Sequence, residues 1–358
     1  MLHFYKLIVS DIRKETADCV SVAFKIPDEL KKDFSFIQGQ NITIKKLLDA
    51  AEVRRSYSVC NSPSQNELRV AIKKVDEGLF STFANEKLQI GDELEVMPAV
   101  GKFHTDLNKN HQKKYLAFAA GSGITPIISI IKTTLETESN SEFTLVYGNK
   151  NRASIIFFEE LENLKNKYIT RFNLMHVLSR ERTESLLNFG RINEEKLLVL
   201  SKLIHYKTID DTFICGPEEM IFCVKDYLQQ QGIEKKKIHF ELFTSTNKKK
   251  KKIIINDVLI SNESFSNISL KVDGRTLDIK IPLNSDTTIL DAALQQGADL
   301  PYACKGGMCC TCKAKLIEGE VSMDVHWGLE DEEVEKGFIL TCQSHPKTEK
   351  VVVDFDAK

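Results

Sequence analysis

The sequence Cys304-Lys305-Gly306-Gly307-Met308-Cys309-Cys310-Thr311-Cys312 decides the fold of the C-terminal part of the chain. Three of its cysteines have the spacing C-x4-C-x2-C, and a fourth, Cys342, follows at a distance. This is the plant-type ligand spacing of a [2Fe–2S] cluster, which thiolates hold. The two glycines let the backbone turn tightly and approach the sulfurs. We therefore expect Cys304, Cys309, Cys312 and Cys342 to bind a [2Fe–2S] cluster in a protein that moves single electrons.

Zinc and disulfides are the other uses of cysteine that the run allows. A structural zinc site usually takes its ligands as two separated pairs, whereas here a triple precedes a single cysteine. Disulfides need an oxidising compartment, and Met1–Ser10 lacks the basic start and long apolar core of a signal peptide. Zinc stays the alternative. Cys310 lies inside the run but does not fit the ligand spacing, so we expect that it does not bind the cluster. Cys19, Cys60 and Cys223 are predicted to be ordinary buried cysteines.

The length and composition bound the class of protein. A chain of 358 residues forms two or three domains, and 42% hydrophobic with 28% charged residues is typical of a globular protein. No apolar run is long enough for a membrane span, so we expect a cytoplasmic protein. The net charge is −2, but residues 253–358 hold 10 Lys and Arg against 18 Asp and Glu. Residues 253–358 are thus acidic, and the rest of the chain is net positive. This difference favours docking between the two parts, or docking of the acidic part on a basic partner. A simple contribution of the acidic residues to solubility explains the excess equally well.

Three domains and one linker are expected from the patterning. Residues 1–107 contain short strands with Gly and Pro between them, which predicts a small antiparallel β-barrel. Residues 108–243 alternate strands and helices, which predicts a doubly wound parallel sheet. The run T-S-T-N-K-K-K-K-K at residues 244–252 contains five consecutive lysines, whose charges repel one another, and no apolar side chain to bury. Because no aromatic residues are interleaved with the lysines, we expect a linker rather than a nucleic-acid site. Residues 253–358 form the cysteine domain, with a hairpin at Asp273-Gly274.

Two motifs in the barrel region suit a flavin nucleotide. Arg55-Ser56-Tyr57-Ser58 offers a guanidinium for a pyrophosphate, an aromatic ring for stacking and a hydroxyl for a ring nitrogen. Gly78-Leu79-Phe80-Ser81-Thr82 follows, and a glycine at a helix start offers backbone N–H groups to a phosphate. When each piece is taken alone, a strand end or a helix cap explains it better than a flavin site does.

Two further motifs end predicted strands of the parallel sheet. Gly121-Ser122-Gly123-Ile124-Thr125-Pro126 leads into an apolar helix over Pro126–Leu135, with Thr125 as the expected N-cap. Cys215-Gly216-Pro217-Glu218 ends a later strand in the same way. Ligands bind at the carboxyl ends of parallel strands, so one nucleotide could touch both turns.

Together these motifs resemble the ferredoxin–NADP reductase superfamily in its usual order, and residues 253–358 resemble a plant-type ferredoxin domain with a β-grasp fold. The resemblance implies FAD at Arg55, Tyr57, Ser58, Gly78, Phe80 and Ser81. It implies nicotinamide nucleotide at Gly121, Gly123, Thr125, Cys215, Gly216 and Glu218. Ser58 and Cys215 lie nearest the chemistry in the family, and Phe243 is the candidate for the aromatic residue that covers the flavin. Ser179-Arg180 matches the pair that holds the 2′-phosphate, so NADPH is expected over NADH; the neighbouring Glu181 keeps NADH possible.

The domain order is similar to that of oxygenase reductases, including the reductase component of phenylacetyl-CoA epoxidase. It implies that electrons pass from NADPH to FAD, then to the cluster and on to a terminal oxygenase. The same order occurs in reductases of other hydroxylases, of desaturases and of the hybrid-cluster protein. A redox sensor or carrier without turnover is the alternative from another class. No nucleic-acid partner is expected.

Overall fold

The computed structural model describes residues 3–49, 51–183, 185–243, 264–283 and 285–357. The predicted linker at residues 244–252 lies outside the described residues. The chain divides into two compact units, of which Phe4–Phe243 is one. The described part of the other consists of residue 3 and the residues from 264 onward. The predicted barrel and the predicted parallel sheet thus belong to one unit.

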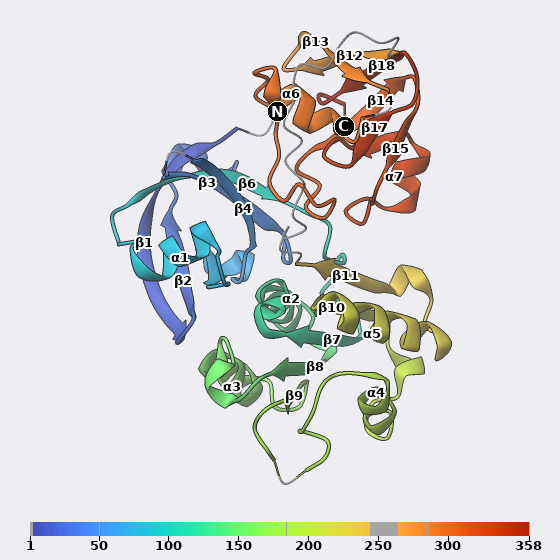
Figure 1. Cartoon of the computed structure of the whole chain (residues 1–358). Coiled ribbons are helices and arrows are strands. Elements are labelled where there is room, and N and C mark those ends of the chain that lie inside the picture. Colours follow the sequence, from blue (N-terminus) through green and yellow to red (C-terminus); the bar gives the residue numbers. More distant parts are fainter. Residues whose placement is uncertain (1–2, 50, 184, 244–263, 284, 358) are drawn as a thin grey trace. The chain divides into compact units, whose positions relative to one another are not determined.

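The first part of Phe4–Phe243 is an antiparallel sheet with the strand order β4-β3-β6-β1-β2-β5 (Figure 1). An isolated bridge between Val59 and Val70 joins the two edges, so the sheet closes on itself as the predicted barrel. The buried members of the strands are mostly Val, Ile and Leu, as the alternation predicts. The strands are β1 Tyr5–Thr16, β2 Cys19–Lys25, β3 Asn41–Leu48, β4 Ala51–Ser58, β5 Leu68–Lys73 and β6 Glu93–Val100, and α1 is Leu79–Glu86.

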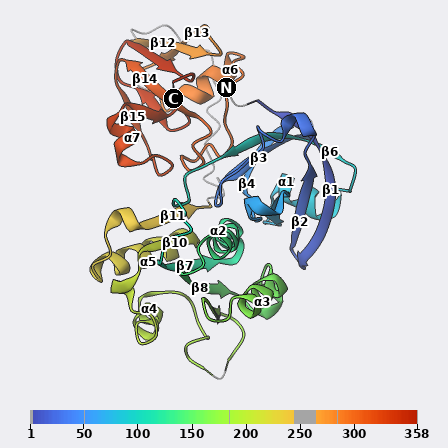
Figure 2. The same ribbon diagram turned by 180° about the vertical axis from the view of Figure 1, so that it is seen from behind.

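The second part is a parallel sheet with the order β11-β10-β7-β8-β9. Figures 1 and 2 show α2 and α3 on one face of this sheet and α4 and α5 on the other. It is the predicted doubly wound fold, and the chain order reverses at β7, which lies between β10 and β8. Its strands are β7 Lys114–Ala120, β8 Glu142–Asn149, β9 Phe172–Leu178, β10 Asp211–Gly216 and β11 Ile238–Leu242; its helices are α2 Ile124–Thr137, α3 Phe158–Lys167, α4 Glu194–Leu200 and α5 Glu218–Gln230.

The C-terminal unit is a mixed sheet with the order β13-β12-β18-β14-β16, crossed by α6. Asp273 and Gly274 both have positive φ, at 48° and 70°, as a two-residue hairpin turn requires. Thr288 caps α6 by accepting a hydrogen bond of 3.1 Å from the backbone N–H of Asp291. The remaining bounds are β12 Phe265–Val272, β13 Arg275–Pro282, α6 Ile289–Gln295, β14 Lys313–Glu318, β15 Val321–Met323, α7 Asp331–Glu335, β16 Phe338–Leu340, β17 Ser344–Pro346 and β18 Lys350–Asp354.

Some local predictions were wrong. Thr125 does not cap α2: the helix begins at Ile124 with Gly123 at the N-cap position, and the Thr125 hydroxyl donates to the carbonyl oxygen of Ser122 at 3.0 Å. The reason is a single 3-10 turn, Gly121–Gly123, that runs directly into the helix. Cys223 is only half-buried, whereas Cys19 and Cys60 are buried as predicted.

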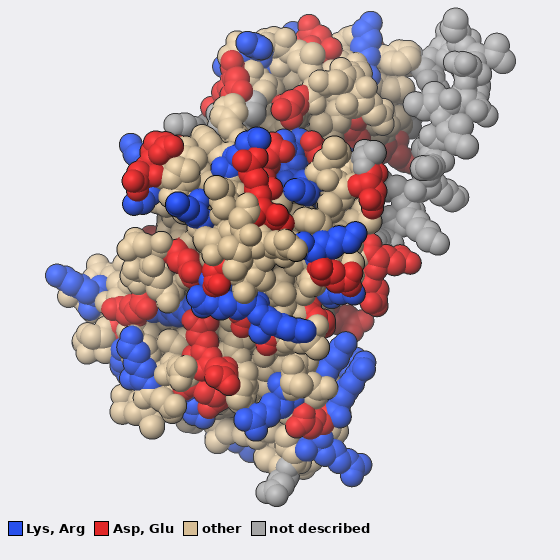
Figure 3. Space-filling model, turned by 90° about the vertical axis from the view of Figure 1, so that its left-hand side faces the viewer, with Lys and Arg blue, Asp and Glu red and all other residues tan. Residues whose placement is uncertain are grey.

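The surface of the described residues is of mixed charge. On the face drawn in Figure 3, Lys and Arg side chains are interspersed with Asp and Glu. Among the helices that the structure describes, none has the length and apolar character needed to cross a membrane.

Candidate functional site

The two predicted nucleotide turns meet at the point where the strand order reverses. A Cβ atom at Gly123 would lie 2.1 Å from the carbonyl oxygen of Cys215, and one at Gly216 would lie 3.0 Å from the Cβ of Ala120. At position 123 only glycine allows this approach, whereas at position 216 a Cβ would make an unusually tight contact. The crevice outside the carboxyl ends of neighbouring strands at such a reversal is where open α/β sheets bind ligands.

The starts of α2 and α5 follow the carboxyl ends of β7 and β10. No side chain caps α5, so its first N–H groups are available to a phosphate. At α2 the N–H of Ile124 already donates to the carbonyl oxygens of Gly121 and Ser122, so it is not available to a ligand. Gly121 has a left-handed φ of 54°, and its carbonyl oxygen accepts a hydrogen bond of 2.9 Å from the hydroxyl of Tyr147. Glu218 is the first residue of α5 and is exposed. The predicted residues Gly121, Gly123, Thr125, Cys215, Gly216 and Glu218 therefore lie at the adjoining carboxyl ends of β7 and β10.

Ser58 and Cys215 come together with a third residue, Glu241, that the motifs did not predict. The Ser58 hydroxyl donates to the Glu241 carboxylate at 3.4 Å, and Glu241 pairs with Cys215 across β10 and β11. Burial, and secondarily the negative charge of Glu241, holds the pKa of the Cys215 thiol well above its usual range. Cys215 is thus a neutral thiol beside a carboxylate. The only signal for Glu241 was a carboxylate within a short strand, H-F-E-L.

The Arg55–Ser58 motif presents two faces of the barrel strand β4. Arg55 and Tyr57 lie on the same face because side chains alternate along a strand. Arg55 is exposed, with one guanidinium nitrogen 2.7 Å from the carbonyl oxygen of Arg54. Tyr57 is half-buried and its ring centroid lies 5.7 Å from that of Phe80. Phe80 itself is only 1% exposed, so its side chain supports Tyr57.

The second flavin motif forms the start of α1. Gly78 is the N-cap residue, and a Cβ there would lie 2.4 Å from the Ser81 hydroxyl. That hydroxyl donates to the carbonyl oxygen of Gly78 and accepts from the N–H of Val75, both at 3.2 Å. Ser81 therefore shapes the turn, and the uncapped N–H groups of α1 are the donors left for an anion.

The predicted 2′-phosphate pair follows β9. The N–H groups of Ser179 and Arg180 donate to the carbonyl oxygens of Asn149 and Lys150 at 2.9 and 2.8 Å, which fixes this loop beside β8. The Arg180 side chain is exposed. The Glu181 carboxylate accepts a hydrogen bond of 2.7 Å from the N–H of Arg152. Glu181 therefore already has a backbone partner, which makes it a weaker candidate for a ribose ligand.

The four predicted cluster cysteines converge as two pairs. The thiols of Cys304 and Cys309 share a hydrogen bond, and so do those of Cys312 and Cys342. These contacts raise the pKa values of Cys304 and Cys312, and they lower those of Cys309 and Cys342. Because the cysteines of a [2Fe–2S] cluster are divided between two irons, paired thiols fit such a group.

The loop around the cysteines supplies further support for thiolates. The N–H groups of Gly306 and Met308 donate to the Cys304 sulfur at 3.3 and 3.4 Å. Gln343, which the motifs did not predict, places its amide nitrogen 3.6 Å from the Cys342 sulfur and 3.0 Å from the Lys305 carbonyl oxygen. Cys310 donates its thiol hydrogen to the carbonyl oxygen of Gly328. Backbone and amide donors of this kind stabilise negative charge on sulfur.

Comparison with known proteins identifies three domains in order. Residues 6–105 match the oxidoreductase FAD-binding domain, residues 118–226 the oxidoreductase NAD-binding domain, and residues 270–347 the 2Fe-2S iron-sulfur cluster binding domain. The predicted cofactors are thereby confirmed at the level of domains, whereas the roles of individual residues stay predictions.

Relatives match over nearly the whole chain. The sequence is 43% identical to one of the subunits of 1,2-phenylacetyl-CoA epoxidase of Escherichia coli, over 100% of this chain and 99% of that one. It is 33% identical to the ferredoxin reductase component of 3-ketosteroid-9-alpha-monooxygenase of Rhodococcus rhodochrous, over 98% and 96% of the two chains.

A solved structure of phthalate dioxygenase reductase shares the fold, with a TM-score of 0.59, 23% identity and 98% coverage of both chains. The chain therefore belongs to the family of oxygenase reductase components, oxidoreductases that carry FAD-, NAD- and [2Fe–2S]-binding domains in this order.

Proposed function

We propose that this chain is the reductase component of a phenylacetyl-CoA epoxidase system. The observation that carries the proposal is the 43% identity to a subunit of that enzyme from Escherichia coli across both full lengths. The steroid monooxygenase reductase, at 33% identity, is more distant. In this role the chain takes electrons from a nicotinamide nucleotide and delivers them to the oxygenase component.

The described residues have defined tasks in this proposal. The Gly121–Gly123 turn and the start of α2 hold the phosphates of the nucleotide, and Arg55 and Tyr57 hold FAD. A bound flavin accepts a hydride and releases electrons singly, which a nicotinamide and an iron–sulfur cluster cannot do for each other. Ser58, Cys215 and Glu241, which lie together, would hold the flavin and nicotinamide rings against each other. The four cysteines hold the cluster that passes electrons on.

We also propose NADPH as the electron donor and the cytoplasm as the location. The exposed Arg180 supports NADPH, because a guanidinium binds a phosphate through two charge-assisted hydrogen bonds. None of the nine cysteines is paired in a disulfide, and four of them are assigned to a cluster, which supports a reducing compartment.

Reconstitution with the purified oxygenase component of a phenylacetyl-CoA epoxidase tests the partner. We expect NADPH-dependent conversion of phenylacetyl-CoA when the two proteins are combined and none when either is omitted. A 3-ketosteroid oxygenase component, supplied in parallel with its own substrate, is the control. Faster turnover with the steroid oxygenase would assign the chain to another oxygenase. NADPH oxidation without transfer to any protein acceptor would favour a sensor or carrier.

A further inference from the structure

Helix α2 carries a polar stripe on an otherwise apolar helix. Ile124, Ile127, Ile128, Ile130, Ile131 and Leu135 are at most 2% exposed and belong to the core of the parallel-sheet region. Ser129, Lys132 and Glu136 are spaced by three and four residues, so they lie on one face of the helix. Ser129 and Lys132 are also almost completely buried, at 0% and 4% exposure. A buried lysine needs partners, and these partners show what the stripe is for.

The partners are backbone atoms of the barrel. The Ser129 hydroxyl donates to the carbonyl oxygen of Asn61 at 2.6 Å, and the Lys132 ammonium donates to that of Cys60 at 2.9 Å. Further along the same face, the Glu136 carboxylate accepts from the hydroxyls of Ser62 and Ser64 at 2.6 and 2.7 Å. The stripe therefore holds the barrel segment of residues 60–64, which is the direct continuation of the Arg55–Ser58 motif.

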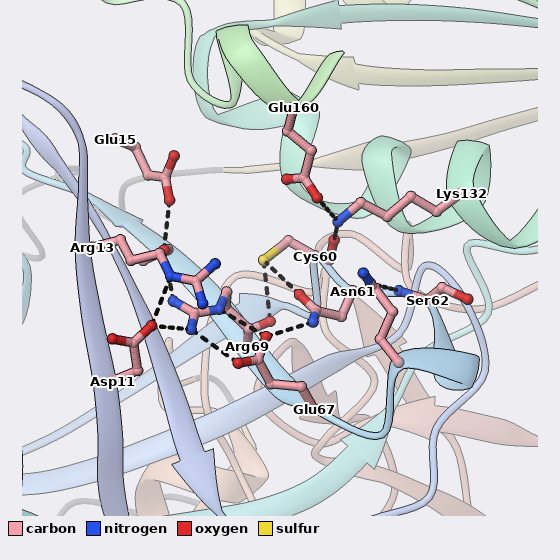
Figure 4. Close-up of polar contacts among 12 residues, drawn as sticks. Asp11, Arg13, Glu15, Cys60, Asn61, Ser62, Glu67, Arg69, Lys132 and Glu160 are labelled. Carbon is pink, nitrogen blue, oxygen red and sulfur yellow. Dashed lines mark hydrogen bonds and ion pairs between the residues drawn. The ribbon is translucent and has the colours of Figure 1, made fainter. Parts of the chain in front are cut away.

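The held segment has polar partners on its other side as well (Figure 4). Asn61 donates to the Glu67 carboxylate at 2.7 Å, and the buried Arg69 contacts both Glu67 and Asp11. The N–H and the thiol of Cys60 both donate to the carbonyl oxygen of Arg69. On the helix side, Lys132 forms an ion pair of 2.6 Å with Glu160 of α3. The barrel segment thus lies between two networks of charged and polar groups.

The start of α2 carries the nucleotide turn Gly121–Gly123, and the stripe on the same helix carries the continuation of the flavin strand. One helix therefore fixes both sites relative to each other. We propose that Ser129, Lys132 and Glu136 are positioning residues that set the separation of the nicotinamide and flavin rings. None of the three touches the reacting atoms. The inference rests on the proposed function only in assuming that the chain transfers a hydride from a nicotinamide to FAD.

The test uses full-length holoprotein with Lys132→Met combined with Glu160→Gln, which removes the donor without leaving an unpaired carboxylate. Flavin reduction by NADPH is followed in single turnovers, which separate the NADPH dissociation constant from the rate of hydride transfer. The long-wavelength absorbance of the nicotinamide–flavin stack reports the geometry independently of the rate. Exchange of backbone amides at residues 59–64 reports the attachment of the segment. Glu159→Gln, an exposed neighbour on α3, is the matched control.

We expect FAD to stay bound and the NADPH dissociation constant to change by less than about threefold. Hydride transfer should slow by roughly 10- to 100-fold, since a misplacement of about 1 Å can cost about 100-fold. The long-wavelength absorbance should weaken and amide exchange at residues 59–64 should rise. Lower thermal stability with an unchanged rate and absorbance would overturn the proposal and leave a structural role.

Milder variants keep the test decisive if the double variant does not fold. Ser129→Ala removes one neutral hydrogen bond and should slow transfer by about 2- to 10-fold. Glu136→Gln retains an acceptor for Ser62 and Ser64 and should match the wild-type rate and absorbance, whereas Glu136→Ala should lower both. Equal behaviour of Gln and Ala at this position would contradict the proposal. If NADPH did not reduce the flavin of the wild-type protein, the proposed function itself would be contradicted.

Discussion

Cys309 and Cys310 are adjacent cysteines with opposite expected roles. Cys309 shares a hydrogen bond with Cys304, whereas Cys310 has a left-handed φ of 54° and donates to Gly328. The variant Cys309→Ser should lose the iron–sulfur cluster, because a hydroxyl is a poor substitute for a thiolate on iron, while NADPH still reduces its flavin. Cys310→Ser should keep the cluster.

Iron and acid-labile sulfide, measured per chain beside the visible spectrum, check this prediction. The ligand assignment is wrong if Cys309→Ser retains as much of both as the wild type. Zinc in place of iron, found by metal analysis of anaerobically purified protein, would support the zinc alternative.

We propose that Arg180 decides between the two nicotinamide nucleotides. Its exposed guanidinium can form charge-assisted hydrogen bonds to a 2′-phosphate, each worth about 1.5–3 kcal/mol. Arg180→Ala should therefore raise the Michaelis constant for NADPH by roughly 10- to 100-fold and barely change that for NADH. Steady-state kinetics with both nucleotides measure this. Equal effects on the two, or a wild-type preference for NADH, would contradict the assignment.

Single residues also show which contacts could be predicted from the sequence and which could not. Arg55, Gly121 and Cys215 belong to contiguous motifs, so their grouping could be predicted. Glu241 approaches Ser58 only because β11 pairs with β10, and the two residues are far apart in the sequence. A carboxylate in a short strand does not indicate which side chains it will meet, since that depends on tertiary pairing.

At the scale of elements, the contact between the turns after β7 and β10 gives a direct prediction. Gly123 has an ordinary φ of −61°, so alanine would cause no backbone strain, but its Cβ would lie 2.1 Å from the Cys215 carbonyl oxygen. Gly123→Ala should destabilise the protein by about 1–3 kcal/mol and weaken NADPH binding, because the two turns must move apart.

Urea unfolding and NADPH titration measure both effects. Ser122→Ala, in the same turn, adds no atoms and should leave stability within about 0.5 kcal/mol of wild type. If Gly123→Ala bound NADPH as tightly as the wild type, the turns after β7 and β10 would not be the nucleotide site.

Elements with strong local signals could be predicted from the sequence. The Asp273-Gly274 hairpin and the apolar strand β7 carry their own turn or packing chemistry. α4 was not predicted, because Glu194–Leu200 is a short amphipathic stretch. The predicted start of α2 was wrong because Thr125-Pro126 has the residue types of an N-cap and first helical position. In the structure these residues lie inside the helix, which begins directly after the 3-10 turn Gly121–Gly123.

At the scale of the whole molecule, the division into two compact units predicts separable activities. A chain that ends at Lys252 keeps the barrel and the parallel sheet and lacks the cysteine domain. It should still reduce ferricyanide with NADPH, because ferricyanide takes electrons directly from the flavin. It should no longer reduce cytochrome c or an oxygenase, since those acceptors need the cluster. Unchanged cytochrome c reduction would count against this order of electron transfer.

The central claim is that electrons reach the cluster from NADPH only through the flavin of the same chain. Anaerobic mixing of the holoprotein with NADPH, followed by absorbance and by electron paramagnetic resonance of rapidly frozen samples, tests it most directly. We predict bleaching of the flavin first and then the signal of a reduced [2Fe–2S] cluster, which disappears from protein stripped of FAD and returns when FAD is added back. A cluster reduced equally fast by NADPH in the FAD-free protein, or not reduced at all in the holoprotein, would contradict the account.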